Sequence, residues 1–184
     1  MKKLFRTLAV TVNLATLIAM IAFGVFHYTE AHAEQAIMNL GEAEIHCLRQ
    51  NIYFEAGNQS DLGKRAVAWV TLNRVVDNRY PDSICGVVQQ GKQNADGSMV
   101  RNACQFSWYC DGKADTVPDT HLEQVQWNKS ELIAKSVLRQ WFLDYIDPTD
   151  GADHYHADYV APNWAASGEH TVQIDKHLFY RVNW

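Results

Sequence analysis

The sequence has no excess of positive charge, and it lacks the short motifs of several common enzyme classes. Its 184 residues carry 16 Lys and Arg against 21 Asp and Glu, which gives a formal net charge of −5. Proteins that bind nucleic acid through its phosphates need a basic surface, so no nucleic-acid partner is expected. There is no H-E-x-x-H pair of a zinc peptidase, no G-x-S-x-G nucleophile motif and no glycine spacing that cradles a phosphate.

Charged residues are also missing between positions 7 and 26. Basic residues precede this apolar run and an A-x-A pattern follows it, which is the layout of a secretory signal peptide cleaved after Ala33. The run is also long enough to cross a bilayer, so a retained or releasable signal anchor is the alternative. Either way, we expect segment 1–33 to direct an exported domain, residues 38–184, to the periplasm or cell envelope. Contact with the membrane is expected only through that N-terminal segment.

Cysteine is scarce, and its arrangement argues against a metal site. The chain has four cysteines and no C-x-x-C pair, so a zinc site has little support. An even number of cysteines in an exported chain favours disulfide bonds. The sequence does not choose among the three possible pairings. Of these we favour Cys85–Cys104 together with Cys47–Cys110.

The rest of the chain predicts one mainly helical domain, because no internal repeat or low-complexity linker divides it. Helical spacing of apolar residues predicts helices at 42–56, 61–77, 83–89 and 131–144. Ser130 is the expected cap of the last helix, and the polar stretch 91–103 is expected to be an exposed loop. Short β-like runs at 171–174 and 177–182 complete an α+β, mainly α, fold with a small β element near the C-terminus.

Glu55 is an acidic residue at a position where an apolar one is expected. It continues the inward stripe of Ile45, Leu48 and Ile52 on the first predicted helix. A carboxyl group that is desolvated in this way has a raised pKa and can act as a general acid near neutral pH. Cleavage of a glycosidic bond needs such an acid to protonate the leaving oxygen. The alternative is a structural pair between Glu55 and an arginine such as Arg74.

Polar and aromatic residues elsewhere are suited to bind sugars. Asn73, on the next helix, is placed to hydrogen-bond a sugar or to orient Glu55. Gln105 and Ser107 are good partners for sugar hydroxyl or acetamido groups, and the neighbouring Phe106 and Trp108 for sugar faces. The alternative for segment 105–108 is a small aromatic core held by a disulfide bond.

The segment 154–158 has two histidines and an aspartate at alternate positions. In a strand, His154, His156 and Asp158 would share one face. A metal site, a polar cleft wall and a purely structural use all remain open. Because no H-E-x-x-H motif accompanies the segment, we expect neither a metal nor another cofactor.

Taken in order, the motifs of this chain resemble the SleB/CwlJ-type cell wall hydrolases, a family named for spore-cortex-lytic enzymes. The matching segments are NIYFEA at 51–56, AVA at 66–68, LNRV at 72–75, YP at 80–81, ICGVV at 84–88, QFSW at 105–108, DG at 111–112, GA at 151–152, HYH at 154–156, PNW at 162–164 and FY at 179–180, with Gly63 and His177. They extend over roughly residues 45–182. The cysteine-containing block CQFSWYCDG resembles versions from Gram-negative bacteria and their phages.

The resemblance implies a lysozyme-like, mostly helical single domain. It implies cleavage of peptidoglycan between N-acetylmuramic acid and N-acetylglucosamine, with Glu55 as the catalytic residue. We expect the protein to be a monomer. The substrate-binding candidates along the expected cleft are Asn73, Gln105, Phe106, Ser107, Trp108, His154, Tyr155 and Trp164. No spore-type wall-binding repeat precedes the matching segments, so specificity for spore cortex is not carried over.

Characterised relatives in the family act as lytic transglycosylases, and we expect the same one-carboxylate chemistry here. Glu55 would protonate the glycosidic oxygen and then take a proton from the muramic C6 hydroxyl, which gives an anhydro sugar. Asp61 and Asp111 are the candidates for a second carboxylate if the enzyme is instead a muramidase that uses water. A metal-dependent amidase or peptidase and a wall-binding module without activity also remain open. The biological role would be that of a phage endolysin or a bacterial wall-remodelling enzyme.

Overall fold

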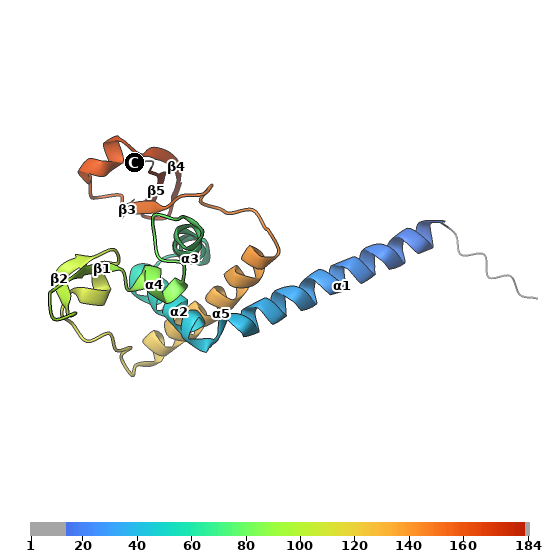
Figure 1. Cartoon of the computed structure of the whole chain (residues 1–184), viewed down its shortest axis with the longest axis horizontal. Helices are drawn as coiled ribbons and strands as arrows, with labels where there is room; N and C mark the ends of the chain where they lie inside the picture. Colours follow the sequence, from blue (N-terminus) through green and yellow to red (C-terminus); the bar gives the residue numbers. More distant parts are fainter. Residues whose placement is uncertain (1–13, 183–184) are drawn as a thin grey trace, which may run out of the picture.

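The computed structural model describes residues 14–182 of the chain. The basic residues and the first part of the apolar run on which the signal-peptide prediction depends lie outside the described residues. The long helix α1 (Leu14–Leu40) projects from the domain, as Figure 1 shows. The predicted boundary after Ala33 therefore falls inside a continuous helix.

Two helices predicted from the sequence form the centre of the domain. They are α2 (Glu42–Ala56) and α3 (Asp61–Val76), and the short α4 (Ile84–Val88) packs against both. Ser60 and Ser83 cap α3 and α4, because each side chain accepts a hydrogen bond from the backbone N–H three residues later. The prediction of these helices is confirmed.

The last long helix begins earlier than predicted. Helix α5 (His121–Phe142) is capped by Thr120, whose hydroxyl accepts from the N–H of Glu123. Ser130 is buried inside this helix and donates to the carbonyl of Gln126. The predicted start at 131 was wrong because the first turns of α5 are mostly polar, and a serine inside a helix can donate its hydroxyl to the carbonyl four residues earlier instead of acting as a cap.

The polar stretch 91–103 is a hairpin, so the predicted loop was wrong. Strand β1 (Gly91–Gln93) pairs antiparallel with β2 (Met99–Cys104). The turn between them contains Gly97 in a left-handed conformation, with φ 84°. Most of the hairpin is exposed, so it has no apolar alternation by which the sequence could reveal it.

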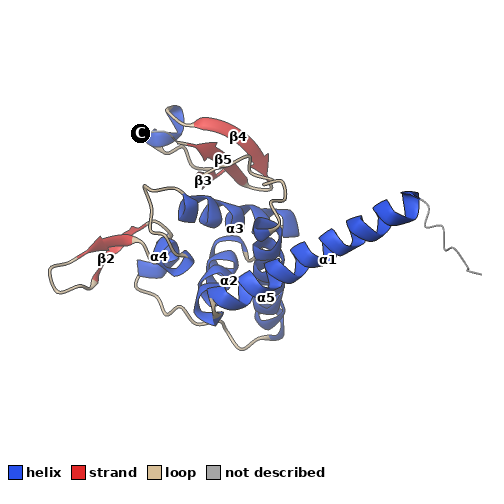
Figure 2. Ribbon diagram, turned by 45° about the vertical axis from the view of Figure 1, so that its right-hand side comes forward, coloured by secondary structure: helices blue, strands red, loops and turns tan. Residues whose placement is uncertain are grey.

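A three-stranded sheet covers α3 on the side away from α2 and α5, as Figure 2 shows. Its antiparallel order is β3 (His154–Ala157), β5 (His177–Arg181) and β4 (Glu169–Ile174). Phe179 and Ile174 pack on Ala66 and Val70 of α3 in a small core beneath the sheet. The predicted strands near the C-terminus and the α+β, mainly α, class are confirmed.

The disulfide bonds differ from the favoured pairing. Cys47 is joined to Cys85 and Cys104 to Cys110. The first bond ties α2 to α4, which pack together, and the second ties β2 to the 3-10 helix η1 (Ser107–Cys110). The favoured pairing was wrong because η1 folds directly back on β2, a local reversal that cysteine spacing does not reveal.

Candidate active site

Glu55 lies in the last turn of α2, partly exposed to solvent and facing the sheet. Its Oε2 atom accepts a hydrogen bond of 2.9 Å from the hydroxyl of Tyr155 on β3. Burial is the largest influence on the Glu55 carboxyl and raises its pKa, while the Tyr155 hydrogen bond and the charge of Arg74 lower it. The carboxyl is thus held protonated to higher pH than an ordinary glutamate.

The backbone that carries Glu55 is fixed by a buried lysine. The side chain of Lys64 is 1% exposed, and its ammonium donates to the carbonyls of Gly57 at 2.7 Å and Gln59 at 2.9 Å. These carbonyls follow the end of α2, where no further helical N–H groups are available to donate to them. The ammonium of Lys64 therefore satisfies the free carbonyls of the turn that follows Glu55.

A chain of buried hydrogen bonds positions the preceding turn of α2. Trp108 Nε1 donates to Asn51 Oδ1 at 3.0 Å, and Asn51 Nδ2 donates to the hydroxyl of Thr71 on α3 at 3.0 Å. Asn51 is fully buried, so the loss of either partner would leave a polar group unsatisfied. This network locks α2, α3 and η1 together beneath the carboxyl.

Arg74 is a buried cation near Glu55, but the two do not form an ion pair within the described residues. Its Nε donates to the carbonyl of Asp153 at 2.7 Å, and its guanidinium lies 5.0 Å from the ring centre of Phe106. Among the described residues its Nη1 atom has no hydrogen-bond partner. The structural Glu55–Arg74 pair considered from the sequence is thus not formed. Arg74 instead contributes positive potential beside the carboxyl.

Tyr155 faces α3, and its hydroxyl contacts the carboxyl of Glu55. Its ring lies 5.0 Å from that of His177 and 5.5 Å from that of Phe179. Burial and the neighbouring Glu55 raise the pKa of Tyr155 well above its ordinary value, so the hydroxyl stays a donor. Burial lowers the pKa of His177, which favours its neutral imidazole.

The two histidines of β3 lie on the opposite face of the sheet from Tyr155. The rings of His154 and His156 are 5.0 and 5.6 Å from the indole of Trp164, in the 3-10 helix η2 (Asn163–Ala166). His154 and His156 share a face as predicted, whereas Asp158 lies beyond the strand. No group of three or more potential metal ligands occurs within residues 14–182.

The segment 105–108 divides into exposed polar and buried aromatic side chains. Gln105 and Ser107 are exposed, while Phe106 and Trp108 are buried. Trp108 stacks on Phe54 with ring centres 4.6 Å apart, directly beside the Cys104–Cys110 bond. Both aromatic residues belong to the main hydrophobic core, together with Leu48 and Leu72, and not to a separate small core at the disulfide bond.

Asn73 is engaged by a neighbouring loop. Its Nδ2 atom donates to Asp147 Oδ2 at 2.8 Å and to the carbonyl of Ala152 at 2.9 Å. These contacts hold the chain that leads into β3 and its Tyr155. The structure thus places Tyr155 and Arg74 near Glu55, while Asn73 holds the loop that leads to Tyr155.

A polar hollow that the sequence did not indicate lies at the end of α2. Its volume is about 570 Å³, and Phe54 and Gly57, close to Glu55 in the chain, line it together with Tyr53 and Glu123. The Tyr53 hydroxyl donates to Glu123 Oε2 at 2.5 Å, and burial together with this carboxylate raises the pKa of Tyr53 to about 12. Glu123 is 68 positions from Glu55 in the sequence, so no local pattern connects them.

The comparisons with known proteins all find proteins that degrade the cell wall. A family model described as Cell Wall Hydrolase matches residues 58–180. The spore cortex-lytic enzyme of Halalkalibacterium halodurans is 27% identical over 154 residues, which are 82% of this chain and 39% of that protein. The chain thus spans about two fifths of the length of this curated relative.

Two solved structures have the same fold. The catalytic domain of the Bacillus cereus SleB protein aligns with a TM-score of 0.54 and 22% identity over 77% of this chain and 91% of that one. The catalytic domain of the germination-specific lytic transglycosylase SleB from Bacillus anthracis aligns with a TM-score of 0.53 and 23% identity, over 77% and 96% of the two chains.

Proposed function

The chain belongs to the cell wall hydrolase family, and from this premise we propose that it cleaves peptidoglycan between N-acetylmuramic acid and N-acetylglucosamine, with Glu55 as the catalytic acid. The observation that carries the proposal is the partly buried carboxyl of Glu55, whose pKa is raised by burial while Tyr155 donates to it. A protonated carboxyl held in one orientation is what a glycosidic leaving oxygen requires.

The second half of the reaction follows from the same group. After giving up its proton, Glu55 is a carboxylate that can take the proton of the muramic C6 hydroxyl as this oxygen closes onto C1. The glycosidic bond breaks, the intramolecular ether forms, and no water is consumed. Tyr155 and Arg74 both favour the carboxylate, so they support the stage at which Glu55 is ionised.

The surroundings of Glu55 favour this route over hydrolysis with a second carboxylate. Among the described residues, Tyr155 and Arg74 are the charged or titratable side chains that act on Glu55. Asp61 pairs with Lys129, and Asp111 pairs with the neighbouring Lys113. Neither aspartate is among the groups that influence the pKa of Glu55, which supports the route with one carboxylate.

We propose different roles for the remaining candidates. Exposed Gln105 and Ser107 are suited to contact the glycan, as are His154 and Trp164 on the outer face of the sheet. Tyr155 orients Glu55 and adjusts its pKa. Phe106 and Trp108 support the site from the core, and Asn73 braces the loop before β3.

The decisive experiment is digestion of purified sacculi by the wild type and by Glu55→Gln, followed by mass analysis of the muropeptides. Glutamine cannot supply a proton, so we expect a loss of about 10³-fold in rate, typical for a general acid. Wild-type products should carry anhydro-muramic ends. The controls Asp61→Asn and Asp111→Asn should keep the wild-type rate and products.

Each competing function has a distinct outcome in this assay. Products heavier by one water would indicate a muramidase. Full activity of Glu55→Gln together with inhibition by a chelator would indicate a metal-dependent amidase or peptidase. Sedimentation of the wild type with sacculi without any loss of turbidity would indicate a wall-binding module.

We also propose that the protein acts outside the cytoplasm, as a monomer in the periplasm or cell envelope. Two disulfide bonds suit an oxidising compartment. Helix α1 is long and apolar enough to cross a membrane, a test that a signal sequence near the N-terminus also passes. Export and tethering are checked by fractionation of expressing cells.

A further inference from the structure

We propose that the catalytic domain has a second membrane contact, formed by the end of α5 and the turn after it, residues 142–146. With α1 inserted, this surface docks on the bilayer beside the helix and fixes the orientation of the domain. The inference rests on the proposal that α1 is retained as an anchor, and it is independent of the chemistry at Glu55.

The first observation is the position at which α1 joins the domain. The candidate membrane-spanning window of α1 has none of its residues buried, and the charge-free run ends at Phe26. The first acidic residue after it is Glu30. Residues 26–30 therefore mark the level at which an inserted α1 would leave the hydrocarbon for the headgroup region.

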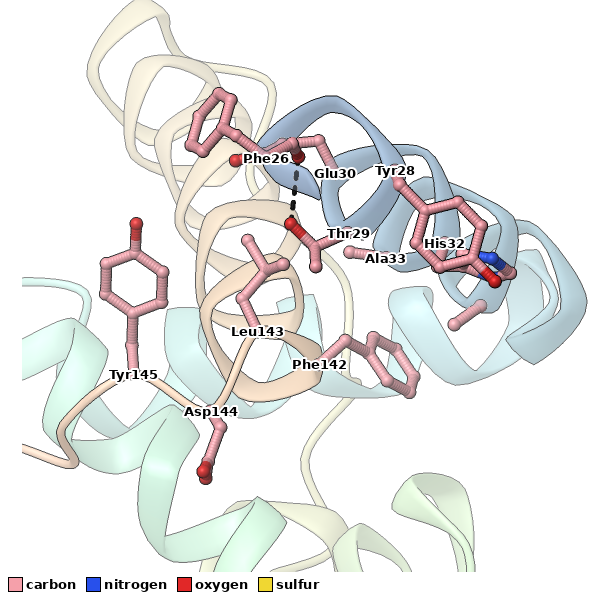
Figure 3. A pocket seen from close by; sticks show the side chains of 11 residues that line it. Phe26, Tyr28, Thr29, Glu30, His32, Ala33, Phe142, Leu143, Asp144 and Tyr145 are labelled. Carbon is pink, nitrogen blue, oxygen red and sulfur yellow. Dashed lines mark hydrogen bonds between the residues drawn. The ribbon is translucent and has the colours of Figure 1, made fainter. Parts of the chain in front are cut away.

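The second observation is a groove at that same level. Its volume is about 610 Å³, and it lies between α1 and the end of α5, as Figure 3 shows. Phe26 and Tyr28 line it from α1, while Phe142 and Tyr145 line it from α5 and the following turn. Aromatic side chains with a polar rim are typical of the membrane–water interface.

The third observation is apolar surface that the domain leaves uncovered. Tyr145 is 55% exposed and Ile146 is 94% exposed, although both are large and apolar. In Figure 1 the turn that carries them follows the orange end of α5, on the side of the domain from which α1 projects. Tyr145 also lines the groove, so part of this exposed surface lies next to the segment of α1 that carries Phe26 and Tyr28.

The fourth observation is a firm connection between the two elements. Arg139 of α5 forms ion pairs with Glu30 and Glu34 of α1, and its Nε lies 2.7 Å from Glu30 Oε2. Ala33, between these acids, is 4% exposed. Cleavage after Ala33 would divide α1 within its contact with α5, so this packing fits a retained helix better than a removed one.

These observations identify the bilayer as the occupant of the groove. One wall of the groove is a helix that can span a membrane, and the groove lies where that helix changes from charge-free to charged sequence. A rigid α1–α5 connection then leaves residues 142–146 facing the headgroups. Headgroups and the upper acyl chains are the ligands that such an amphipathic, aromatic-lined surface accepts.

The test uses the full chain in vesicles of phosphatidylethanolamine and phosphatidylglycerol, with photoreactive benzoylphenylalanine placed at one position at a time. Position 25 reports insertion of α1, and positions 145 and 146 report docking. Tyr159 is the matched control, because it is an exposed tyrosine, 84% accessible, in a loop that lies away from α1. We expect lipid crosslinking at 145 and 146 to exceed that at 159 by about tenfold, since only an interfacial side chain meets lipid.

Every different outcome overturns the proposal in a recognisable way. Crosslinking at 25 with 145 and 146 at the level of 159 would leave α1 an anchor without a docked domain. No crosslinking at 25 would show that α1 is not inserted. Equal crosslinking at all four positions would show unspecific adsorption. Digestion of sacculi by the same variants reports separately on the proposed glycan cleavage.

Discussion

At the scale of single residues, the pKa of Glu55 is set by opposing influences. Burial favours the neutral carboxyl, whereas the Tyr155 hydroxyl and the Arg74 cation favour the carboxylate. A general acid that must also serve as a base needs both protonation states to be accessible. The partners of Glu55 are therefore expected to govern the pH dependence of the reaction as well as its rate.

Substitution Tyr155→Phe should move the alkaline limb of the activity profile to higher pH. In the proposed mechanism activity requires protonated Glu55, so activity should be lost as the pH rises through the pKa of this group. The Tyr155 hydrogen bond stabilises the carboxylate and lowers that pKa, so its removal raises the pKa further. The measurement is sacculus turbidity against pH. Tyr180→Phe, whose hydroxyl contacts His156 on the outer face, should leave the limb in place.

Substitution Glu55→Gln should stabilise the protein relative to the wild type as the pH rises. A group with a raised folded-state pKa contributes stability below its unfolded pKa and loses it as the pH rises through the folded value. Glutamine stays neutral throughout. The difference in Tm between variant and wild type should therefore grow from about pH 4, near the pKa of an unperturbed glutamate, toward neutrality. A difference in Tm that shrinks as the pH rises would contradict burial as the largest influence on the pKa of Glu55.

At the scale of elements, the disulfide bonds hold short pieces that could not maintain their position alone. Helix α4 has five residues and η1 has four. Helices of this length are not stable by propensity, so they depend on packing and on covalent ties. The bond between α2 and α4 fixes the helix that carries Glu55, while the bond between β2 and η1 fixes the ring of Trp108 beneath it.

Removal of the two disulfide bonds should have unequal effects on stability. Cys47–Cys85 encloses 38 positions and Cys104–Cys110 encloses six. The chain-entropy argument gives about 4 kcal/mol for the first loop and about 2 kcal/mol for the second. Paired Cys→Ala variants compared by urea unfolding measure the difference. A larger loss for the short loop would show that local packing at η1, rather than loop entropy, dominates.

At the scale of the whole molecule, α1 is both a projecting apolar helix and part of the domain. Its N-terminal half is exposed, and its C-terminal half contacts α5 through Arg139. Ile37 and Leu40 add apolar contact with the main core. The proposed anchor α1 is therefore packed directly against the domain through its C-terminal half.

Charge reversal at Arg139 should loosen this connection without affecting catalysis. In Arg139→Glu the acids at 30 and 34 meet a like charge, so amide hydrogen exchange should increase in residues 30–40. Activity on solubilised glycan should be unchanged, because Arg139 contacts α1 and not the site. Arg181→Glu is the matched control, since Arg181 is 38% exposed against 46% for Arg139 and forms exposed ion pairs on β5. Equal exchange in both variants would contradict a specific contact between Arg139 and α1.

The sequence by itself determined the local features of this protein. The apolar period placed Glu55 on the inner face of a helix at 42–56, and it identified the helices at 61–77 and 83–89 and the strands at the C-terminus. Such patterns depend on neighbours within a few positions, so they can be followed along the chain. The ordered motifs also indicated the family.

Tertiary structure decided which distant groups meet. Tyr155 donates to Glu55 from 100 positions away, and sheet register alone turns it to the inner face while His154 and His156 turn outward. Packing likewise chose the cysteine pairs, the burial of Phe106 and the bracing role of Asn73. These contacts depend on how elements dock, which local periodicity does not encode because the docked partners are far apart in sequence.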